Sequence, residues 1–121
     1  MLIHELARQT GLTPATIRYY EHEGLLDKTH SYRAQNNYRH YTEAAVERLL
    51  LIKQGQAAGF TLAEMRELID TWYTDALTLD DKRAIVLHKI AELERRIAEL
   101  EAMRATLLAK LPLMGQVGAV T

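Results

Sequence analysis

The sequence predicts a mainly α-helical fold in which short helices and one β-hairpin precede a single long C-terminal helix. Apolar residues recur at helical spacing on both sides of residues 25–41, whereas that stretch has no helical period. Residues 79–111 contain no glycine or proline and carry an apolar heptad pattern. These observations predict a small helical domain with a hairpin, followed by a coiled-coil helix.

The first two helices are predicted to form a helix-turn-helix. A helix over residues 3–10 places its apolar residues on one stripe, and Gly11 is expected to stop it. Thr13 is a good N-cap for a second helix that reaches Glu23, because Pro14 at the first helical position needs no amide partner. Two helices joined by a short glycine-containing turn are typical of this motif.

The stretch 25–41 is predicted as a small two-stranded hairpin. Tyrosines alternate with polar residues around Asn36 and Asn37. Asparagine tolerates a positive φ better than other residues with a side chain, so this pair can form a type I′ turn, although less well than Asn-Gly. A basic hairpin directly after a recognition helix indicates the wing of a winged helix-turn-helix.

Two further helices are predicted after the hairpin. Thr42 is expected to cap a helix that Gly59 ends, and the next helix begins with Thr61 and Glu64 at the spacing of a capping box. The predicted order is therefore helix, helix, hairpin, helix, helix.

The last predicted element is a helix over residues 79–111. At 1.5 Å per residue it would be about 50 Å long, too long to bury its apolar seam against the preceding domain. We therefore expect it to pair with a second copy of the chain. Alternating steps of four and three define the seam as Val86, Ile90, Leu93, Ile97, Leu100, Leu107 and Leu111, with Arg104 at one core position.

The composition excludes several classes of protein. The 121 residues carry a net charge of −1 and include no cysteine, which rules out disulfides and thiolate metal sites within this sequence. No apolar run approaches membrane-spanning length and nothing resembles a signal peptide, so no membrane contact and a cytoplasmic location are expected. The sequence has no glycine-rich phosphate loop and no Ser/His/Asp constellation, so neither enzymatic activity nor a cofactor is expected.

The charges are unevenly distributed. Lys28, Arg33 and Arg39 are the ionised residues between positions 28 and 42, whereas ten of the sixteen acids lie in the C-terminal half. Basic residues of this kind on a wing would bind DNA phosphates, which supply affinity and register. In the second helix, Arg18 and Tyr20 are expected to reach DNA, and Tyr19 is interpreted as the core residue that orients them.

Three blocks of this sequence together resemble the MerR family of bacterial transcription regulators. They are "IHELARQTGLTPATIRYYEHEGLL", "NNYRHYTEAAVERLLLIKQGQAAGFTLAEMRELI" and the heptad helix, and they span residues 2–111. The resemblance implies a winged helix-turn-helix DNA-binding domain with a second, helical wing over residues 1–75. It also implies an antiparallel dimerisation helix over residues 76–111, followed by a tail over residues 112–121.

The resemblance further implies a homodimer on double-stranded DNA, at a pseudo-palindromic promoter operator that RNA polymerase also uses. Family members distort this DNA when an effector is bound. The family motif places Thr13, Ala15, Thr16 and Arg18 at the groove, Tyr20, Arg33, Asn36, Tyr38 and Arg39 at the backbone, and Phe60 beside the second wing.

The sequence departs from the metal-sensing members of the family, which hold thiophilic ions through cysteines at the start of the dimerisation helix and in the tail. Neither place has a cysteine here, so no metal site is expected and the effector is an unknown small molecule. The possible effector region is Trp72 and Tyr73 with Leu79 and His88. The competing interpretations are packing of the two aromatic residues at an interdomain elbow and a solvated histidine. A nitrogen–oxygen metal site built from two copies of His88 is a further alternative.

Two other functions also agree with the sequence. The heptad helix could engage a different protein, with the helix-turn-helix as its scaffold. Alternatively, the chain could be an excisionase-like architectural protein that binds DNA without an effector switch.

Overall fold

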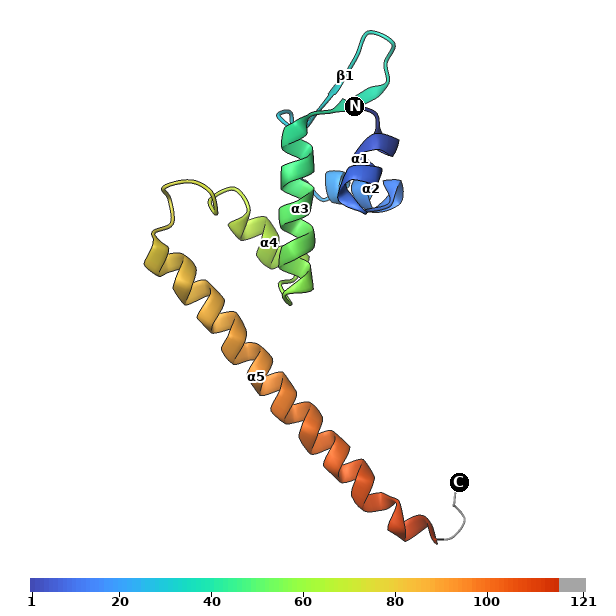
Figure 1. Ribbon diagram of the computed structural model, residues 1–121, viewed down its shortest axis with the longest axis vertical. Coiled ribbons are helices and arrows are strands. Elements are labelled where there is room, and N and C mark those ends of the chain that lie inside the picture. Colours follow the sequence, from blue (N-terminus) through green and yellow to red (C-terminus); the bar gives the residue numbers. More distant parts are fainter. Residues whose placement is uncertain (116–121) are drawn as a thin grey trace. The chain divides into compact units, whose positions relative to one another are not determined.

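The computed structural model describes residues 1–115, and the chain forms two compact units, Met1–Ala76 and a second that begins at Leu77 (Figure 1). The expected tail over residues 112–121 therefore lies partly outside the described residues. The predicted mainly helical fold with a two-stranded hairpin is confirmed. Its elements are α1 (Ile3–Thr10), α2 (Pro14–His22), β1 (Ser31–Arg33), β2 (Arg39–Tyr41), α3 (Glu43–Ala57), α4 (Leu62–Leu68), α5 (Leu79–Lys110) and the short 3-10 helix η1 (Pro112–Met114).

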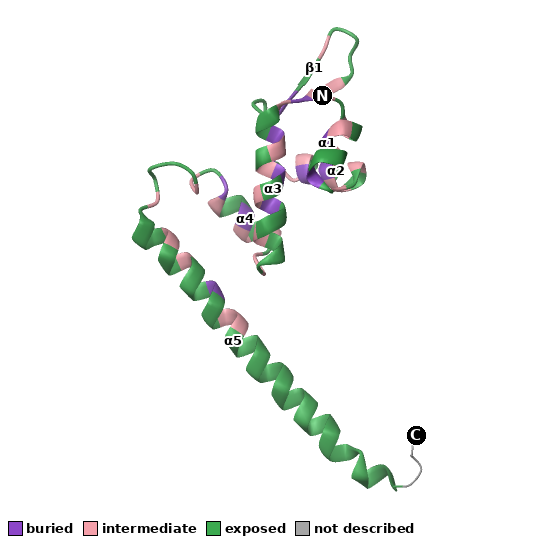
Figure 2. Cartoon of the chain, in the orientation of Figure 1, coloured by how far each residue is buried: buried purple, intermediate pink, exposed green. Residues whose placement is uncertain are grey.

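The core of the first unit lies where α1 packs against α2 and α3 and where α4 packs against α3. Figure 2 shows these buried positions on the inner faces of the short helices. The predicted end of α1 is confirmed, because Gly11 adopts φ 74° and its N–H bonds to the carbonyl of Ala7 at 2.9 Å. The Lys53 ammonium bonds to the Thr10 carbonyl at 3.0 Å, so α3 helps to cap α1.

Helix α2 begins as predicted, with the Thr13 hydroxyl accepting a hydrogen bond from the Thr16 N–H at 3.1 Å. The assignment of Tyr19 to the core is wrong. Tyr19 is 53% exposed, whereas Tyr20 is 7% exposed and packs with Ile17 in the core. The reason is helical geometry, because residues three apart share a face and Ile17 is fully buried.

The hairpin forms as predicted, but its turn differs from the predicted type I′. Strands β1 and β2 are antiparallel, and Arg33 lies opposite Arg39. The Asn37 N–H bonds to the Ala34 carbonyl at 2.8 Å, and the Ala34 N–H bonds to the Tyr38 carbonyl at 3.0 Å. Within residues 1–115, Asn37 is the one residue other than glycine with a positive φ, 64°. A type I′ turn requires two such residues, so the loop is the three-residue kind that ends in one left-handed position.

The two predicted caps beyond the hairpin have different outcomes. Thr61 and Glu64 form the predicted capping box of α4, with reciprocal hydrogen bonds of 2.8 and 3.1 Å. Thr42 stands at the N-cap position of α3 but makes no side-chain cap. Its hydroxyl donates to the Thr29 carbonyl at 2.8 Å instead, so this side chain closes the base of the hairpin.

The second unit consists of α5 and η1. Helix α5 matches the predicted long helix and begins with a capping box between Thr78 and Asp81 that the sequence prediction did not include. Its surface is green, hence exposed, along most of its length in Figure 2. Over residues 1–115 no helix combines the length and apolarity that a membrane crossing requires.

Candidate nucleic-acid interface

One exposed stripe runs along α2. Ala15, Arg18, Tyr19 and His22 are all exposed, and their spacing places them on the side of the helix opposite the buried Ile17. At the start of the helix the Thr13 hydroxyl also donates to the hydroxyl of Thr16 at 2.9 Å. The predicted groove-facing residues Thr13, Ala15, Thr16 and Arg18 therefore lie together on the first turns of α2.

Tyr20 does not belong to this stripe. Its hydroxyl donates to the Gln56 side chain at 2.6 Å, and burial raises the pKa of Tyr20 above its ordinary value. The predicted role of Tyr20 in holding the DNA backbone thus disagrees with its position in the core. Tyr19 occupies the exposed position instead, and its spacing of four from Ala15 is the signal that could have identified it.

A hollow of about 520 Å³ lies between α2, the wing (residues 31–41) and the start of α1. We call it the α2–wing hollow. It brings together three of the predicted DNA-contacting arginines and one predicted tyrosine, which lie far apart in the sequence. Its charged and aromatic lining is His4, Arg18, Glu21, Arg33, Tyr38, Arg39 and Tyr41.

The two wing arginines differ in their partners. Arg33 donates to the Asn37 carbonyl at 2.9 Å and is exposed. Arg39 is partly buried and forms an ion pair with Glu21 at 2.9 Å. Tyr41 also donates to Glu21, at 3.0 Å, and burial together with this hydrogen bond raises the pKa of Tyr41 to about 12. No motif in the sequence marks Glu21 as a functional residue.

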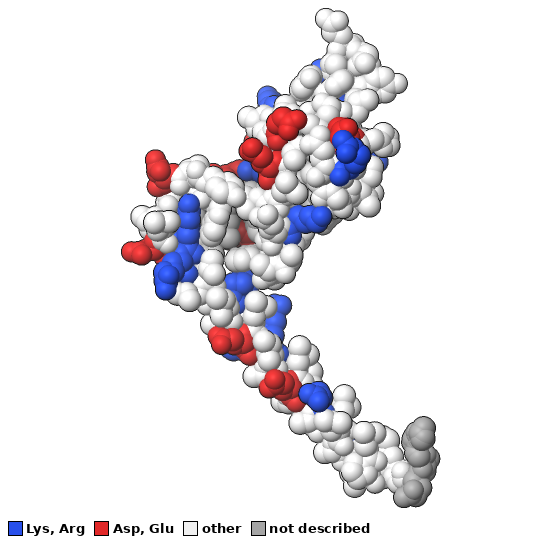
Figure 3. All heavy atoms as spheres, viewed as in Figure 1, with Lys and Arg blue, Asp and Glu red and all other residues white. Residues whose placement is uncertain are grey.

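The remaining predicted DNA contacts lie outside the hollow's lining. Asn36 is exposed in the wing loop and accepts a hydrogen bond from the Tyr38 N–H at 3.1 Å. The projecting end of the wing is uncharged in the view of Figure 3. Phe60 is half-buried and packs against the core just before α4.

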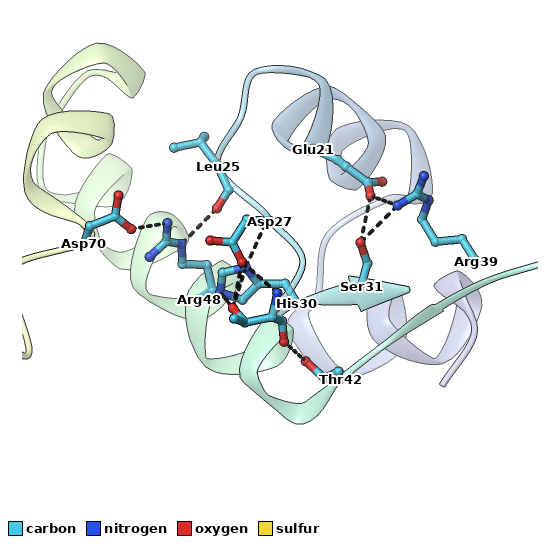
Figure 4. Close-up of polar contacts among 10 residues, drawn as sticks. Glu21, Leu25, Asp27, His30, Ser31, Arg39, Thr42, Arg48 and Asp70 are labelled. Atoms are coloured by element: carbon cyan, nitrogen blue, oxygen red, sulfur yellow. Dashed lines mark hydrogen bonds and ion pairs between the residues drawn. The ribbon is translucent and has the colours of Figure 1, made fainter. Parts of the chain in front are cut away.

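A second polar network connects the base of the wing to α3 and to the residues after α4 (Figure 4). Arg48 donates to the Leu25 carbonyl at 2.8 Å and to Asp70 at 2.6 Å. Beside it, the ring Nδ1 of His30 lies 2.9 Å from the backbone N of Asp27 and 3.0 Å from the Asp27 carboxylate. Burial lowers the pKa of His30 and so favours the neutral ring, whereas the Asp27 carboxylate opposes this effect.

The possible effector region divides between the two units. Trp72 is partly buried and Tyr73 is exposed in the connection after α4, whereas Leu79 and His88 lie on α5. Tyr73 also lines a separate hollow of about 250 Å³ with His30, Arg48 and Asp70. In the part of the chain that the structure describes, no three His, Asp or Glu side chains are grouped so that they could hold a metal ion.

The predicted seam of α5 presents apolar side chains at its surface. Ile97, Leu100 and Leu107 are more than half exposed. Toward the end of the helix an apolar groove of about 460 Å³ is lined by Leu100, Met103, Arg104, Leu107, Leu108 and Leu111. In Figure 3 the last turns of α5 carry no charge on the visible face, whereas both signs of charge occur earlier along the helix.

Two family profiles match this chain. The profile described as "MerR HTH family regulatory protein" matches residues 1–72, and the one described as "MerR, DNA binding" matches residues 46–110. The first covers every residue that lines the α2–wing hollow, and the second extends along α5.

Curated relatives resemble the chain over most of its length. The HTH-type transcriptional regulator CueR of Yersinia pestis is 42% identical over 109 residues, which are 90% of this chain and 77% of that protein. The HTH-type transcriptional regulator ZntR of Escherichia coli K12 is 37% identical over 106 residues, which are 87% of this chain and 74% of that protein.

Solved structures resemble the chain as well. The transcription regulator PbrR691 of Ralstonia metallidurans CH34, in complex with lead(II), has a TM-score of 0.77 at 33% identity, over 90% of this chain and 84% of that one. HiNmlR, described as a MerR family regulator lacking the sensor domain and bound to promoter DNA, has a TM-score of 0.63 at 21% identity. This match covers 99% of this chain and 89% of that one and supports the fold alone.

Proposed function

The chain belongs to the MerR family of transcription regulators, and we propose that it binds a pseudo-palindromic promoter operator through α2 and the wing. Proteins of this family bind DNA and act as dimers; they are regulators rather than enzymes. The family relationship favours this function over the protein-interaction and architectural alternatives that the sequence alone left open.

The observation that carries this proposal is the α2–wing hollow. Arg18 and Arg33 line one concave surface of about 520 Å³ beside the exposed stripe of α2, and Arg39 lines it while paired with Glu21. Cationic side chains that converge on a hollow next to a recognition helix can bind the phosphates that flank a major groove. Tyr38, exposed at the end of the wing, adds a hydroxyl and a ring to the same surface.

The start of α2 is the part that reads base edges in this proposal. Thr13, Ala15, Thr16 and Arg18 lie on its first turns, and Tyr19 joins them on the exposed stripe. Arg is the side chain that most often reads guanine in the major groove, and small side chains allow the helix to approach closely. Arg33, Asn36 and Tyr38 are assigned to the DNA backbone, and Tyr20 and Phe60 are assigned to packing.

We also propose that α5 forms an antiparallel coiled coil with its copy in a homodimer. Residues 86–111 carry the heptad seam, and its apolar side chains lie exposed on the described chain. Burial of such a seam is favourable by about 25 cal/mol per Å² of apolar surface. Arg104 at a core position would specify the register at some cost in stability.

The sensing function is proposed to use a small effector and to act through RNA polymerase at the same promoter. Lead(II) is bound by the related PbrR691, but this sequence has no cysteine with which to hold a thiophilic ion. The residues present therefore do not fit a thiolate-held metal. Trp72 and Tyr73 with Leu79 and His88 remain the candidate region. Trp72 is the single tryptophan, so a ligand bound beside it should change the protein's tryptophan fluorescence.

The DNA-binding proposal is tested by two substitutions with the same change of charge. Arg18→Gln removes a lining residue of the hollow, whereas Arg8→Gln removes an exposed arginine of α1 that does not line it. Binding is measured by fluorescence anisotropy on duplexes recovered from a random-sequence pool. We expect about a tenfold or larger loss for Arg18→Gln and little change for Arg8→Gln. Equal losses for the two variants would contradict the proposed site.

A further inference from the structure

The Glu21 carboxylate is the centre of a hydrogen-bond network that joins the end of α2 to both strands of the wing. One oxygen accepts from the Ser31 hydroxyl at 3.1 Å and pairs with Arg39 at 2.9 Å. The other accepts from the Tyr41 hydroxyl at 3.0 Å. Arg39 and Ser31 also bond to each other at 3.0 Å, so the network is closed (Figure 4). A single side chain of α2 therefore contacts β1 and β2 at once.

This network is partly shielded from solvent. The Glu21 side chain is 21% exposed and that of Arg39 is 37% exposed, while Ser31 and Tyr41 are buried. An ion pair that is partly removed from water and shares further hydrogen bonds is stronger than an open surface pair. The network is therefore suited to fix the position of the wing relative to α2.

The register of the hairpin gives this carboxylate a second role. Arg33 and Arg39 stand directly opposite each other on the two strands. Like charges in this relationship repel and destabilise the pairing of the strands. Glu21 compensates the charge of Arg39, and Arg33 is directed to the carbonyl of Asn37.

The position of Glu21 in the hollow is unfavourable for the simple attraction of DNA. Among the described residues, it is the one acid that lines the α2–wing hollow, and it follows Arg18 by three residues on α2. A carboxylate there repels an incoming phosphate and reduces affinity for any DNA. A contribution of Glu21 to DNA binding must therefore come from geometry.

We propose that Glu21 is a positioning residue: it fixes the angle between the wing and α2, and its ion pair keeps Arg39 within the network that joins them. Glu21 thereby contributes to sequence discrimination and lowers general affinity for DNA. This inference rests on the proposed DNA-binding function and assigns to Arg39 a structural role in place of a direct phosphate contact.

The test compares two charge-neutralising variants at the end of α2. Glu21→Gln removes the central charge of the network. Glu23→Gln is the matched control, because Glu23 pairs with Arg66 at 3.1 Å and does not line the hollow. Affinity is measured at one salt concentration on the selected duplex and on a scrambled duplex. For Glu21→Gln we expect unchanged or tighter binding to the scrambled duplex and a ratio of specific to nonspecific affinity about tenfold lower. Glu23→Gln should keep the ratio of the unaltered protein.

Tyr41→Phe gives a second, milder test, since it removes one hydrogen bond to Glu21 without a change of charge. For Tyr41→Phe, the ratio of specific to nonspecific affinity should fall less than for Glu21→Gln. Its affinity for the scrambled duplex should not increase. A ratio for Glu21→Gln equal to that for Glu23→Gln would overturn the proposal. An equal loss of affinity for both duplexes would also overturn the proposal, because partial unfolding would produce that result.

A measurement without DNA separates this inference from the proposed function. The Ala34 N–H bonds across the hairpin to the Tyr38 carbonyl, and its hydrogen exchange reports on the wing. We expect exchange at Ala34 to be about tenfold faster in Glu21→Gln and unchanged in Glu23→Gln. If the unaltered protein preferred no duplex, the DNA-binding proposal would fail, and this exchange would still test the role of Glu21. Unchanged exchange in Glu21→Gln would overturn it.

Discussion

The Tyr20 hydroxyl donates a hydrogen bond of 2.6 Å to the Gln56 side chain and so ties α2 to the last turn of α3. Tyr19, its neighbour in sequence, is exposed although the centres of the two rings lie only 6.1 Å apart. Two adjacent tyrosines thus have different environments, and substitution of each should affect a different property.

Tyr20→Phe should lower stability. It removes the hydrogen bond to Gln56 and keeps the buried ring, so the free energy of unfolding should fall by about 1 kcal/mol. Urea-induced unfolding followed by circular dichroism measures this change. An unchanged free energy of unfolding would show that the hydrogen bond contributes nothing to the fold.

Tyr19→Ala should lower DNA affinity and leave stability nearly unchanged. An exposed side chain without a core role contributes within about 0.5 kcal/mol to the free energy of unfolding. The same unfolding assay, together with anisotropy on the selected duplex, separates the two effects. Normal affinity in this variant would remove Tyr19 from the proposed recognition surface.

Asn37→Ala should destabilise the wing. Asn37 has φ 64°, and alanine in the left-handed region costs about 1 kcal/mol. Asn37→Gly should be tolerated, because glycine adopts this conformation without strain. Gln35→Ala in the same loop serves as the control. Chemical shifts and exchange of the wing amides measure the effect, and an identical response to Asn37→Ala and Gln35→Ala would contradict the strained turn.

Stability should decrease as the pH falls below neutrality, and His30 should contribute to the decrease. Burial lowers the pKa of His30, so the folded protein keeps the neutral ring, although Asp27 and Asp70 nearby oppose this effect. As the pH falls through the unfolded value of about 6.5, the unfolded chain binds a proton that the folded chain does not. The free energy of unfolding then falls by at most about 1.4 kcal/mol per pH unit from this residue.

His30→Asn keeps a hydrogen-bond acceptor near the Asp27 N–H and removes the titration. Unfolding measured from pH 8 to pH 5.5 should show a smaller slope in this variant. His4→Asn changes an exposed histidine and should retain the original slope. A slope that is the same in all three proteins would exclude His30 as its source.

The orientation of the proposed coiled coil can be measured with one spin label. The sequence contains no cysteine, so Arg83→Cys provides a unique labelling site near the start of α5. In an antiparallel dimer with full overlap of the seam, the two labels would be roughly 45 Å apart at 1.5 Å per residue. Parallel pairing would place them at about the 8–10 Å separation of packed helices, and such a short distance would refute the antiparallel arrangement.

Local signals were sufficient to predict most elements. Gly11, Thr13 and the Thr61–Glu64 pair each act within a few residues, and the structure confirms their roles. The long helix was equally accessible, because an uninterrupted heptad pattern has few alternatives.

Contacts between distant residues were not accessible in the same way. Thr42 has a good cap composition, yet its hydroxyl bonds to Thr29 across the base of the wing. In the sequence, nothing distinguishes Glu21 from other acids near helix ends. Its role depends on the contacts with Ser31, Arg39 and Tyr41, which form only when the hairpin packs against α2. The Tyr19 and Tyr20 assignments failed for a different reason, since the spacing from Ile17 already favoured Tyr20 as the buried residue.

Selection of bound duplexes from a random-sequence DNA pool tests the central claim most directly. The purified protein should recover an inverted repeat at moderate salt, since a symmetric dimer presents two copies of α2 to two half-sites. Recovery of no motif, with binding that disappears as the salt concentration rises, would contradict sequence-specific operator binding by this chain.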